Sequence, residues 1–283
     1  SAWLLESFRQ APAPQAIVDA RAIRDALRNA GYTSRALGAR VLGGTPVAAA
    51  AAPTQVLRRT PEGKAPPRDD EVDALIALFA LGLSVERREL PTTYEALKPI
   101  LAEDMTARCM VAPVGALRDA GDDLYVVTDW PPEKRLTDEE PCMYLGPDSL
   151  ALADLASSLA KGKRVADVCA GSGVQGLVAT RAGAASICWV EAEARAAAFC
   201  RLNGALNDVE GDVVVDRVNN VADGTYDVIL ANPPYVATPS SLSYEAFAAG
   251  GPDGYDVLKD VVTYAARHLA EDGLLACVFE LNG

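Results

Sequence analysis

The second half of the chain alternates between short apolar runs and longer segments with helical spacing. Leucines at helical spacing begin this half near residue 150, and five apolar runs of strand length follow, at 165–169, 186–190, 213–215, 226–231 and 274–279. Helical patterns separate them at 174–182, 192–206 and 255–269. Strands that alternate with helices predict an α/β fold with a doubly wound, mostly parallel sheet and helices on both faces.

The first half follows a different pattern. Helical spacing covers 13–30, where Gly31 supplies a left-handed cap, and recurs at 34–42, 71–83 and about 91–102. Apolar runs at 109–117 and 124–128 flank a polar turn and predict a hairpin. The stretch 44–70 is rich in alanine and proline and reads as an extended connection. We therefore predict a smaller, mainly helical N-terminal accessory domain, 1–135, of winged-helix-like or small mixed fold, and a second domain, 136–283.

Charge is distributed unevenly between these parts. The 283 residues carry a net charge of −13, yet residues 1–68 hold ten basic against four acidic side chains. A basic segment on an acidic body can dock a polyanion such as RNA, or an acidic protein. The alternative is that Arg21, Arg24 and Arg28 form one solvated helix face. The sequence also contains no run of about 18 uncharged apolar residues that would predict a membrane span.

Histidine and cysteine usage narrows the chemistry. The single histidine, His268, would have to serve any His-based zinc site, Ser-His-Asp triad or Cys-His pair, so no metal site is predicted. Its place late in a helical pattern predicts a surface or capping role. The six cysteines are scattered without a C-x-x-C pair, which favours a reducing, cytoplasmic location with thiols acting as small apolar side chains.

Candidate site residues lie where the predicted strands end, because ligands of such sheets bind beyond the carboxyl ends of the strands. The first strand runs into Asp167-Val168-Cys169-Ala170-Gly171-Ser172-Gly173 and then a helix, so two glycines allow a tight turn and close approach of a ligand. The second strand ends at Glu191, an acid that can accept both hydroxyls of a ribose. The third ends at Asp216.

The fourth strand ends in Asn232-Pro233-Pro234-Tyr235, the most specific signal in the sequence. Two consecutive prolines fix φ and donate no backbone hydrogen bonds, so the chain leaves the sheet in a rigid turn. The Asn232 side chain and the Pro233 carbonyl then form a fixed pair of acceptors, and Tyr235 can stack beside them. Two acceptors and an aromatic face suit a planar NH2 group.

These strand ends resemble those of class I S-adenosylmethionine-dependent methyltransferases, in the group whose fourth motif is Asn-Pro-Pro-Tyr or Asn-Pro-Pro-Phe. The release-factor glutamine methyltransferases are the most similar pattern. The stretch Gly146-Pro147-Asp148-Ser149 resembles their Arg-Pro-Asp-Thr, and Tyr244-Glu245-Ala246 followed by Asp253-Gly254 resembles the segment after their tetrapeptide. The chain also looks like uncharacterised bacterial methyltransferases with a long helical N-terminal domain. The resemblance covers about half of the chain.

The resemblance implies S-adenosyl-L-methionine as cofactor and assigns roles to individual residues. Asn232, Pro233 and Tyr235 would bind the substrate nitrogen. Glu191 would take the ribose hydroxyls and Asp216 the adenine amino group, with Arg217 or Val218 on one adenine face. The complete cofactor set would be Asp167, Cys169, Ala170, Gly171, Gly173, Glu191, Asp216, Arg217 and Asn232. Two positions depart from the family pattern, since Cys169 replaces the usual first glycine and Glu191 replaces the commoner Asp.

The expected activity is methyl transfer to a planar amino or amide nitrogen of a macromolecule, either a protein glutamine or a base of RNA or DNA. Two alternatives remain open. One is a small-molecule N-methyltransferase whose N-terminal region acts as a lid. The other is a non-catalytic, cofactor-binding scaffold, favoured by an apparent lack of the last two strands of the family's sheet.

Overall fold

The computed structural model describes residues 14–41, 68–115, 122–131, 141–221, 224–239, 241–242 and 244–281. Contacts divide the chain into two compact units. Unit 1 comprises Ser1–Asp138, Tyr144–Gly146 and Ala205–Asp208, and unit 2 comprises Glu139–Met143, Pro147–Gly204 and Val209–Gly283. Most of the predicted connection 44–70 lies outside the described residues.

Unit 2 is built on a parallel sheet, which confirms the predicted fold class. Its strands are β3 (Arg164–Val168), β4 (Ser186–Glu191), β5 (Asp212–Val215), β6 (Tyr226–Ala231) and β7 (Leu269–Cys277). They lie in the order β5-β4-β3-β6-β7, and every neighbouring pair is parallel. The chain therefore builds outward from β3 in one direction and then returns to its other side at β6.

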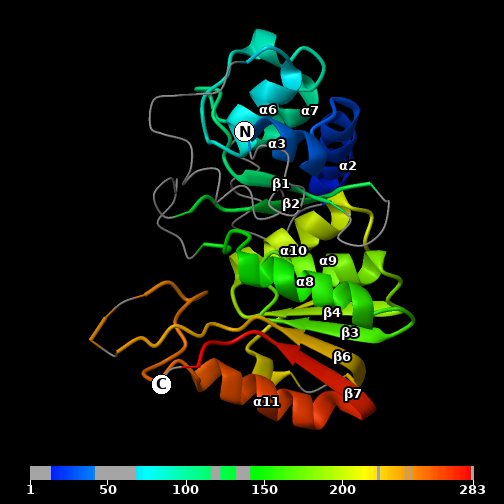
Figure 1. Ribbon diagram of the computed structural model, residues 1–283, viewed down its shortest axis with the longest axis vertical. Coiled ribbons are helices and arrows are strands. Elements are labelled where there is room, and N and C mark those ends of the chain that lie inside the picture. The colour runs from blue at the N-terminus through cyan, green and yellow to red at the C-terminus, as the bar shows by residue number, and fades with distance from the viewer. Residues whose placement is uncertain are drawn as a thin grey trace. The chain divides into compact units, whose positions relative to one another are not determined.

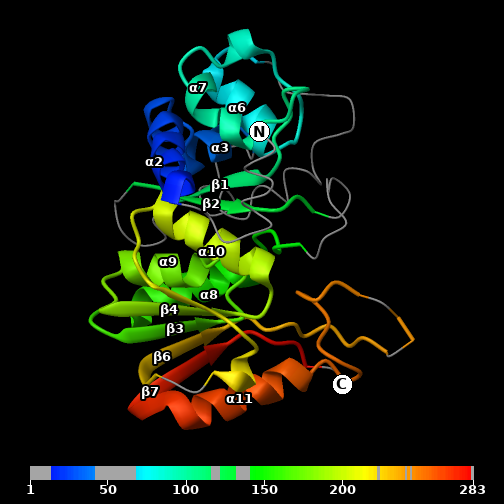
Figure 2. The ribbon, with the colours of Figure 1, turned by 180° about the vertical axis from the view of Figure 1, so that it is seen from behind.

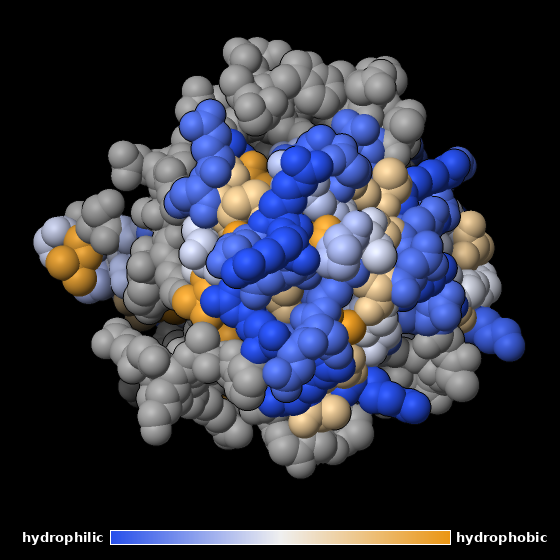
Figure 3. Space-filling view, turned by 90° about the horizontal axis from the view of Figure 1, so that it is seen from above, coloured by the Kyte–Doolittle hydropathy of each residue, from blue (hydrophilic) through white to orange (hydrophobic). Residues whose placement is uncertain are grey.

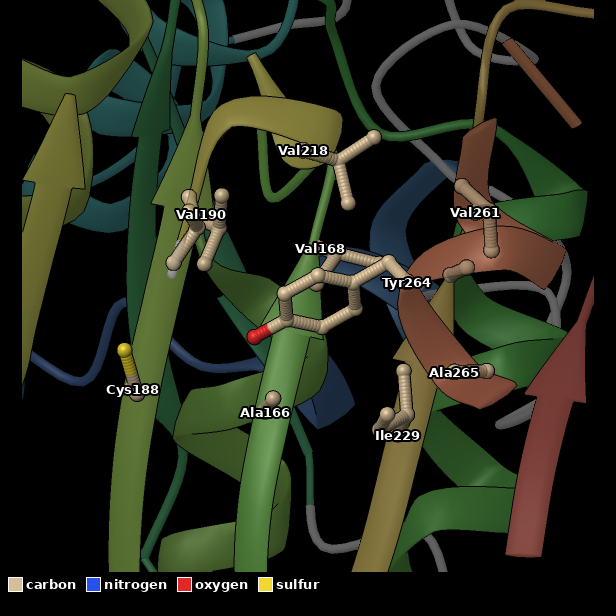
Figure 4. Close-up of a cluster of buried hydrophobic side chains, with 11 residues drawn as sticks. Ala166, Val168, Cys188, Val190, Val218, Ile229, Val261, Tyr264 and Ala265 are labelled. Carbon is tan, nitrogen blue, oxygen red and sulfur yellow. The ribbon is translucent and has the colours of Figure 1, made fainter. Parts of the chain in front are cut away.

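Helices cover both faces of this sheet (Figure 1). On one face lie α8 (Pro147–Leu159), α9 (Val174–Arg181) and α10 (Ala194–Leu206), and on the other lies α11 (Asp256–His268). Strand β3 is buried along four of its five residues because it is central and covered on both sides. Towards α11, alternate residues of β3 and β6 pack against Val261, Tyr264 and Ala265, and Figure 4 shows the Tyr264 ring lying over β3.

The histidine lies in the same layer, and its predicted surface role is wrong. His268 ends α11 and is 95% buried, since 5% of its surface is exposed. Its ring stacks on Tyr264 with centroids 4.3 Å apart, and Nδ1 lies 2.8 Å from the carbonyl oxygen of Gly224. Its position late in a helix predicted an exposed side chain. The fold, however, places the Gly224 carbonyl, in the loop before β6, within hydrogen-bonding distance of the ring.

Unit 1 combines short helices with one hairpin. Strands β1 (Met110–Val114) and β2 (Leu124–Thr128) pair antiparallel, as predicted, and the turn between them includes residues outside the described part. The predicted helix at 91–102 is shorter and divided, because Pro99 cannot donate a backbone hydrogen bond. The helices are α2 (Pro14–Asn29), α3 (Ser34–Val41), α6 (Glu71–Phe79), α7 (Tyr94–Leu97) and the 3-10 turns η1 (Arg87–Glu89) and η2 (Lys98–Ile100).

Four of the five arginines of α2 and α3 form ion pairs within unit 1. Arg21 and Arg24 both pair with Asp208, at 2.6 Å for Arg21, and Arg28 pairs with Asp122 at 3.2 Å. Arg40 binds two acids at the start of α6, the N-cap residue Asp70 and Asp73 in the first turn. The basic excess of this segment is thus partly neutralised internally, although the face seen in Figure 3 is mostly hydrophilic.

Three further findings concern the described residues as a whole. None of their helices is long and apolar enough to cross a membrane. No group of three or more His, Cys, Asp or Glu side chains among them is arranged to hold a metal ion. All six cysteines are free thiols, four of them buried.

Candidate active site

The strand order brings the predicted site residues to one edge of unit 2. Strand β3 lies between β4 and β6, and Val168 is in register with both Val190 and Ala231. The glycine loop, Glu191 and Asn232 therefore leave three adjacent strands at the same level. This is the point where the order of the strands reverses, which is where doubly wound sheets bind ligands. The connection from β6 to α11 extends beyond that edge (Figures 1 and 2).

The loop after β3 uses left-handed backbone at three positions. Cys169, Gly171 and Gly173 have φ of +55°, +54° and +77°. A Cβ built on Gly171 would meet nothing within 4 Å, so the space above this glycine is open. A Cβ on Gly173 would lie 2.9 Å from Nε1 of Trp189. Gly171 thus faces open space, while Gly173 allows the loop to pack on the Trp189 indole.

Three side chains hold three consecutive carbonyl groups of this loop. Cys200 donates to the Gly171 oxygen at 3.1 Å, and Asn203 donates to that of Ser172 at 2.9 Å. Trp189 Nε1 donates to the Gly173 oxygen at 3.1 Å. The sequence prediction did not include these residues. One signal was present, because Cys200 and Asn203 stand three apart and therefore share one face of α10.

Two buried carboxyl groups flank the loop. Asp167 accepts from the backbone N–H of Gly176 at 2.9 Å, and burial raises its pKa to about 8. Glu191 accepts from the N–H groups of Gly171 at 2.7 Å and Glu193 at 2.9 Å. Burial also raises the pKa of Glu191, against the opposing effect of those hydrogen bonds. Glu191 thereby ties the end of β4 to the loop that follows β3.

The predicted adenine-binding residues occupy different environments. Asp216 and Arg217 are exposed just after β5, where Asp216 Oδ1 accepts from the Arg217 N–H at 2.7 Å and from Asn220 Nδ2 at 2.9 Å. Val218 belongs to the hydrophobic cluster under α11 (Figure 4). Of the two candidates for the adenine face, Arg217 is therefore the accessible one. Ala170, at the start of the loop, is buried.

Asn232 is held on one side and lacks a partner on the other. Its Nδ2 donates to Asp148 Oδ2 at 2.8 Å and to Ser149 Oγ at 3.1 Å, both in the first turn of α8. Its Oδ1 is buried and has no hydrogen-bond partner. Leaving such an acceptor unsatisfied costs about 1–3 kcal/mol. Pro233 beside it is buried, and Tyr235 is half-buried.

Comparison with known proteins identifies this half of the chain. The family model described as Methyltransferase small domain matches residues 149–282. Residues 149–282 are a methyltransferase small domain. The matched range includes the loop after β3, Glu191 and the Asn-Pro-Pro-Tyr turn, so each of these features belongs to the methyltransferase domain.

Individual relatives match this chain over limited lengths. A release factor glutamine methyltransferase of Mycolicibacterium smegmatis is 32% identical over 140 residues, 46% of this chain and 50% of the relative. A ribosomal protein uL3 glutamine methyltransferase of Xanthomonas campestris is 40% identical over 70 residues, 22% of this chain and 23% of the relative. The chain thus spans about half, or less, of the length of these relatives.

Among solved structures, a ribosomal protein L11 methylase of Lactobacillus delbrueckii is 22% identical to this chain. The match covers 58% of this chain and 78% of that one, with a TM-score of 0.39. The fold assignment of the methyltransferase domain rests on its own sheet order and on the family match.

Proposed function

We propose that the methyltransferase domain transfers a methyl group from S-adenosyl-L-methionine to the side-chain amide nitrogen of a protein glutamine. The observation that carries this proposal is the buried, unpartnered Oδ1 of Asn232 at the switch point of the sheet. The names of the relatives support the choice of acceptor, since two of them are glutamine methyltransferases.

The residues beyond β3 and β4 fit the proposed cofactor. The open space above Gly171 is a cradle that a side chain at this position would fill. Glu191 is fixed by two backbone N–H groups, and its carboxylate retains lone pairs that can accept ribose hydroxyls. When bound, S-adenosyl-L-methionine supplies an electrophilic methyl group on a positively charged sulfur. In this proposal Gly171 and Glu191 hold it, and Asp216 with Arg217 receives the adenine.

Asn232 and Pro233 would act on the substrate nitrogen. An amide nitrogen is a poor nucleophile because its lone pair is delocalised into the carbonyl group. Acceptors placed on its two hydrogens shift electron density towards nitrogen and favour the pyramidal transition state. Asn232 Oδ1 is buried and has an unused hydrogen-bonding position for one hydrogen, and the Pro233 carbonyl is the proposed acceptor for the second. Such positioning needs no acid or base from the buried His268.

Charge in unit 1 favours a protein over a nucleic acid as acceptor. Binding a nucleic acid depends on basic side chains that neutralise phosphates. Arg21, Arg24, Arg28 and Arg40 are instead paired with acids of the same unit. Exposed apolar side chains also occur between β6 and α11, where Leu242 and Tyr244 are more than half exposed. Such residues suit contact with a protein segment.

A labelled-methyl experiment tests the proposal. The protein is incubated with tritiated S-adenosyl-L-methionine and a soluble cell extract, and the labelled products are digested separately with protease and nuclease. We expect protease alone to release the label, and amino-acid analysis to place it on glutamine nitrogen. Nuclease-sensitive label would overturn the glutamine assignment in favour of a base. Absence of S-adenosylhomocysteine binding in calorimetry at high concentration would overturn the enzyme proposal altogether.

A further inference from the structure

The start of α8 fixes which way the Asn232 amide faces. Asp148 Oδ2 and Ser149 Oγ lie 2.8 and 3.1 Å from Nδ2, although they are 84 and 83 residues away in the sequence. An amide nitrogen carries two hydrogens, so these two contacts use its whole donor capacity. The side chain cannot turn over without breaking both hydrogen bonds.

The chemistry of Asp148 makes this orientation unambiguous. A carboxylate accepts hydrogen bonds and does not donate them, so the nitrogen of Asn232 must face it. The reverse orientation would place Oδ1 against the carboxylate, where two acceptors repel. The oxygen is therefore directed away from α8, and it is the atom that is buried without a partner.

We propose that Asp148 and Ser149 are positioning residues for methyl transfer, a role that rests on the proposed function of Asn232. They hold the amide so that Oδ1, and never Nδ2, meets the substrate. The contact to a carboxylate also polarises the amide, because hydrogen bonds in a chain strengthen one another. Oδ1 becomes a stronger acceptor for the substrate N–H. The Pro147-Asp148-Ser149 stretch thus acts through Asn232 rather than on the substrate itself.

Nuclear magnetic resonance of the free protein tests the orientation without any substrate. With asparagine labelled in nitrogen-15, the Asn232 side-chain signal is assigned by its loss in Asn232→Asp. In the wild type we expect its two hydrogens to exchange slowly with water. Asp148→Ala should speed exchange by at least about tenfold, since it removes a hydrogen bond to a charged group. Unchanged exchange would overturn the proposal.

Two variants of Asp148 separate the effect of its hydrogen bond to Asn232 from the effect of its negative charge at the start of α8. Asp148→Asn keeps an acceptor oxygen of the same reach but removes the charge at the start of α8, whereas Asp148→Ala removes both. We expect methyl transfer to protein in a soluble extract to fall about tenfold or more in the alanine variant, because misplacement of a reacting group costs rate steeply. The asparagine variant should regain part of that loss, because it keeps an acceptor oxygen but loses the charge that polarises the amide and gains an NH2 group that can donate. Equal losses in the two variants would overturn the proposal.

Matched controls address a merely structural effect. Asp256→Ala removes an exposed first-turn carboxylate from α11 that pairs with Lys259, and Ser158→Ala removes an exposed hydroxyl from α8. Neither control should change transfer. The affinity of Asp148→Ala for S-adenosylhomocysteine, measured by calorimetry, should stay within about twofold of that of the wild type. In free energy this is well below the roughly 1.4 kcal/mol that corresponds to a tenfold change. A parallel loss of affinity would assign Asp148 to the cofactor site instead.

Failure of the positioning role and failure of the proposed function give different results. If the wild-type protein transfers no methyl group to protein, the proposed function fails. The exchange measurement still decides whether Asp148 and Ser149 fix the amide, because it needs neither cofactor nor substrate. If the wild type is active and exchange is insensitive to Asp148→Ala, only the positioning role fails.

Discussion

The loop after β3 and the turn after β6 emerge side by side but are built in opposite ways. In the loop, the carbonyls of Gly171, Ser172 and Gly173 each receive a side-chain donor, and Glu191 receives two backbone N–H groups. In the turn, Asn232 is saturated at Nδ2 and unsatisfied at Oδ1. One region is complete without a ligand, whereas the other lacks one donor.

This difference suits the loop to holding a cofactor and the turn to accepting a hydrogen bond from a substrate. A loop whose carbonyl groups are held by side chains of the protein keeps its shape whether or not a cofactor is bound, which lowers the entropy lost on binding. An unsatisfied buried acceptor is energetically costly in the free protein and is relieved when a donor arrives. Substitutions in the loop should therefore change stability and cofactor affinity, whereas substitutions in the turn should change methyl transfer with little effect on cofactor affinity.

The largest expected effect comes from the turn. Asn232→Ala should reduce methyl transfer by about 100-fold or more, because it removes the proposed acceptor for the reacting nitrogen. The affinity for S-adenosylhomocysteine should remain close to that of the wild type. Radiolabel transfer and calorimetry measure the two quantities, with Asn219→Ala, an exposed asparagine of the same unit, as control. Full activity in Asn232→Ala would remove the distinction between the two regions.

The second effect concerns the acids beside the loop. The pKa of Asp167 is about 8 in the folded protein and about 3.9 in an unfolded chain. The folded state therefore retains a proton that the unfolded state has lost, and the free energy of unfolding should fall as pH rises from about 4 to 8. The slope for one such group is at most about 1.4 kcal/mol per pH unit, and the raised pKa of Glu191 acts in the same direction.

Urea denaturation at several pH values measures this dependence. Asp167→Asn keeps an acceptor for the Gly176 N–H but cannot ionise, so the slope between pH 4 and 8 should flatten. Asp227→Asn is the control. Its hydrogen bonds to Arg164 lower its pKa, so any contribution is lost only as pH falls below about 3.9. An unchanged slope in Asp167→Asn would mean that the carboxyl group is not kept protonated by burial.

A smaller effect is expected where α10 holds the loop. Asn203→Leu preserves side-chain size but leaves the Ser172 carbonyl without its donor, which should lower the free energy of unfolding by about 2 kcal/mol. The affinity for S-adenosylhomocysteine should fall with it. Ala198→Gly, on the same helix, should cost about 1 kcal/mol of stability through helix propensity and leave the affinity unchanged. Equal affinities in both variants would show that the loop keeps its shape without Asn203.

Local patterns predicted the fold well, and long-range contacts account for what was missed. Strand β6 begins and ends at the predicted residues, because an apolar run bounded by polar residues suffices to define it. Strand β7 begins five residues earlier than predicted, at Leu269. The pairing with β6 shifts register between Tyr226 and Val228, and this irregularity accommodates the exposed Glu271 and Asp272 that suggested a loop.

In the candidate site too, local patterns were predicted and long-range contacts were missed. The glycine loop, Glu191 and the Asn-Pro-Pro-Tyr turn were visible as motifs, since each is contiguous or ends a strand. Asp148, Cys200 and Asn203 act from other elements and become partners only through the sheet order and helix packing. A single sequence carries no record of which distant residues meet. The roles of the motif residues in binding remain predictions.

The smallest effect tests backbone strain within the loop. Cys169 has φ of +55°, a conformation that costs a residue with a Cβ about 1–2 kcal/mol and costs glycine nothing. Glycine normally destabilises relative to alanine by about 0.5–1 kcal/mol. At position 169 the order should reverse, so that Cys169→Gly unfolds at a higher urea concentration than Cys169→Ala. At the neighbouring Ala170, whose φ is not positive, Ala170→Gly should show the ordinary loss. The same loss at both positions would mean that the loop after β3 relaxes around its side chains, and the contrast between a complete loop and an incomplete turn would then be one of degree.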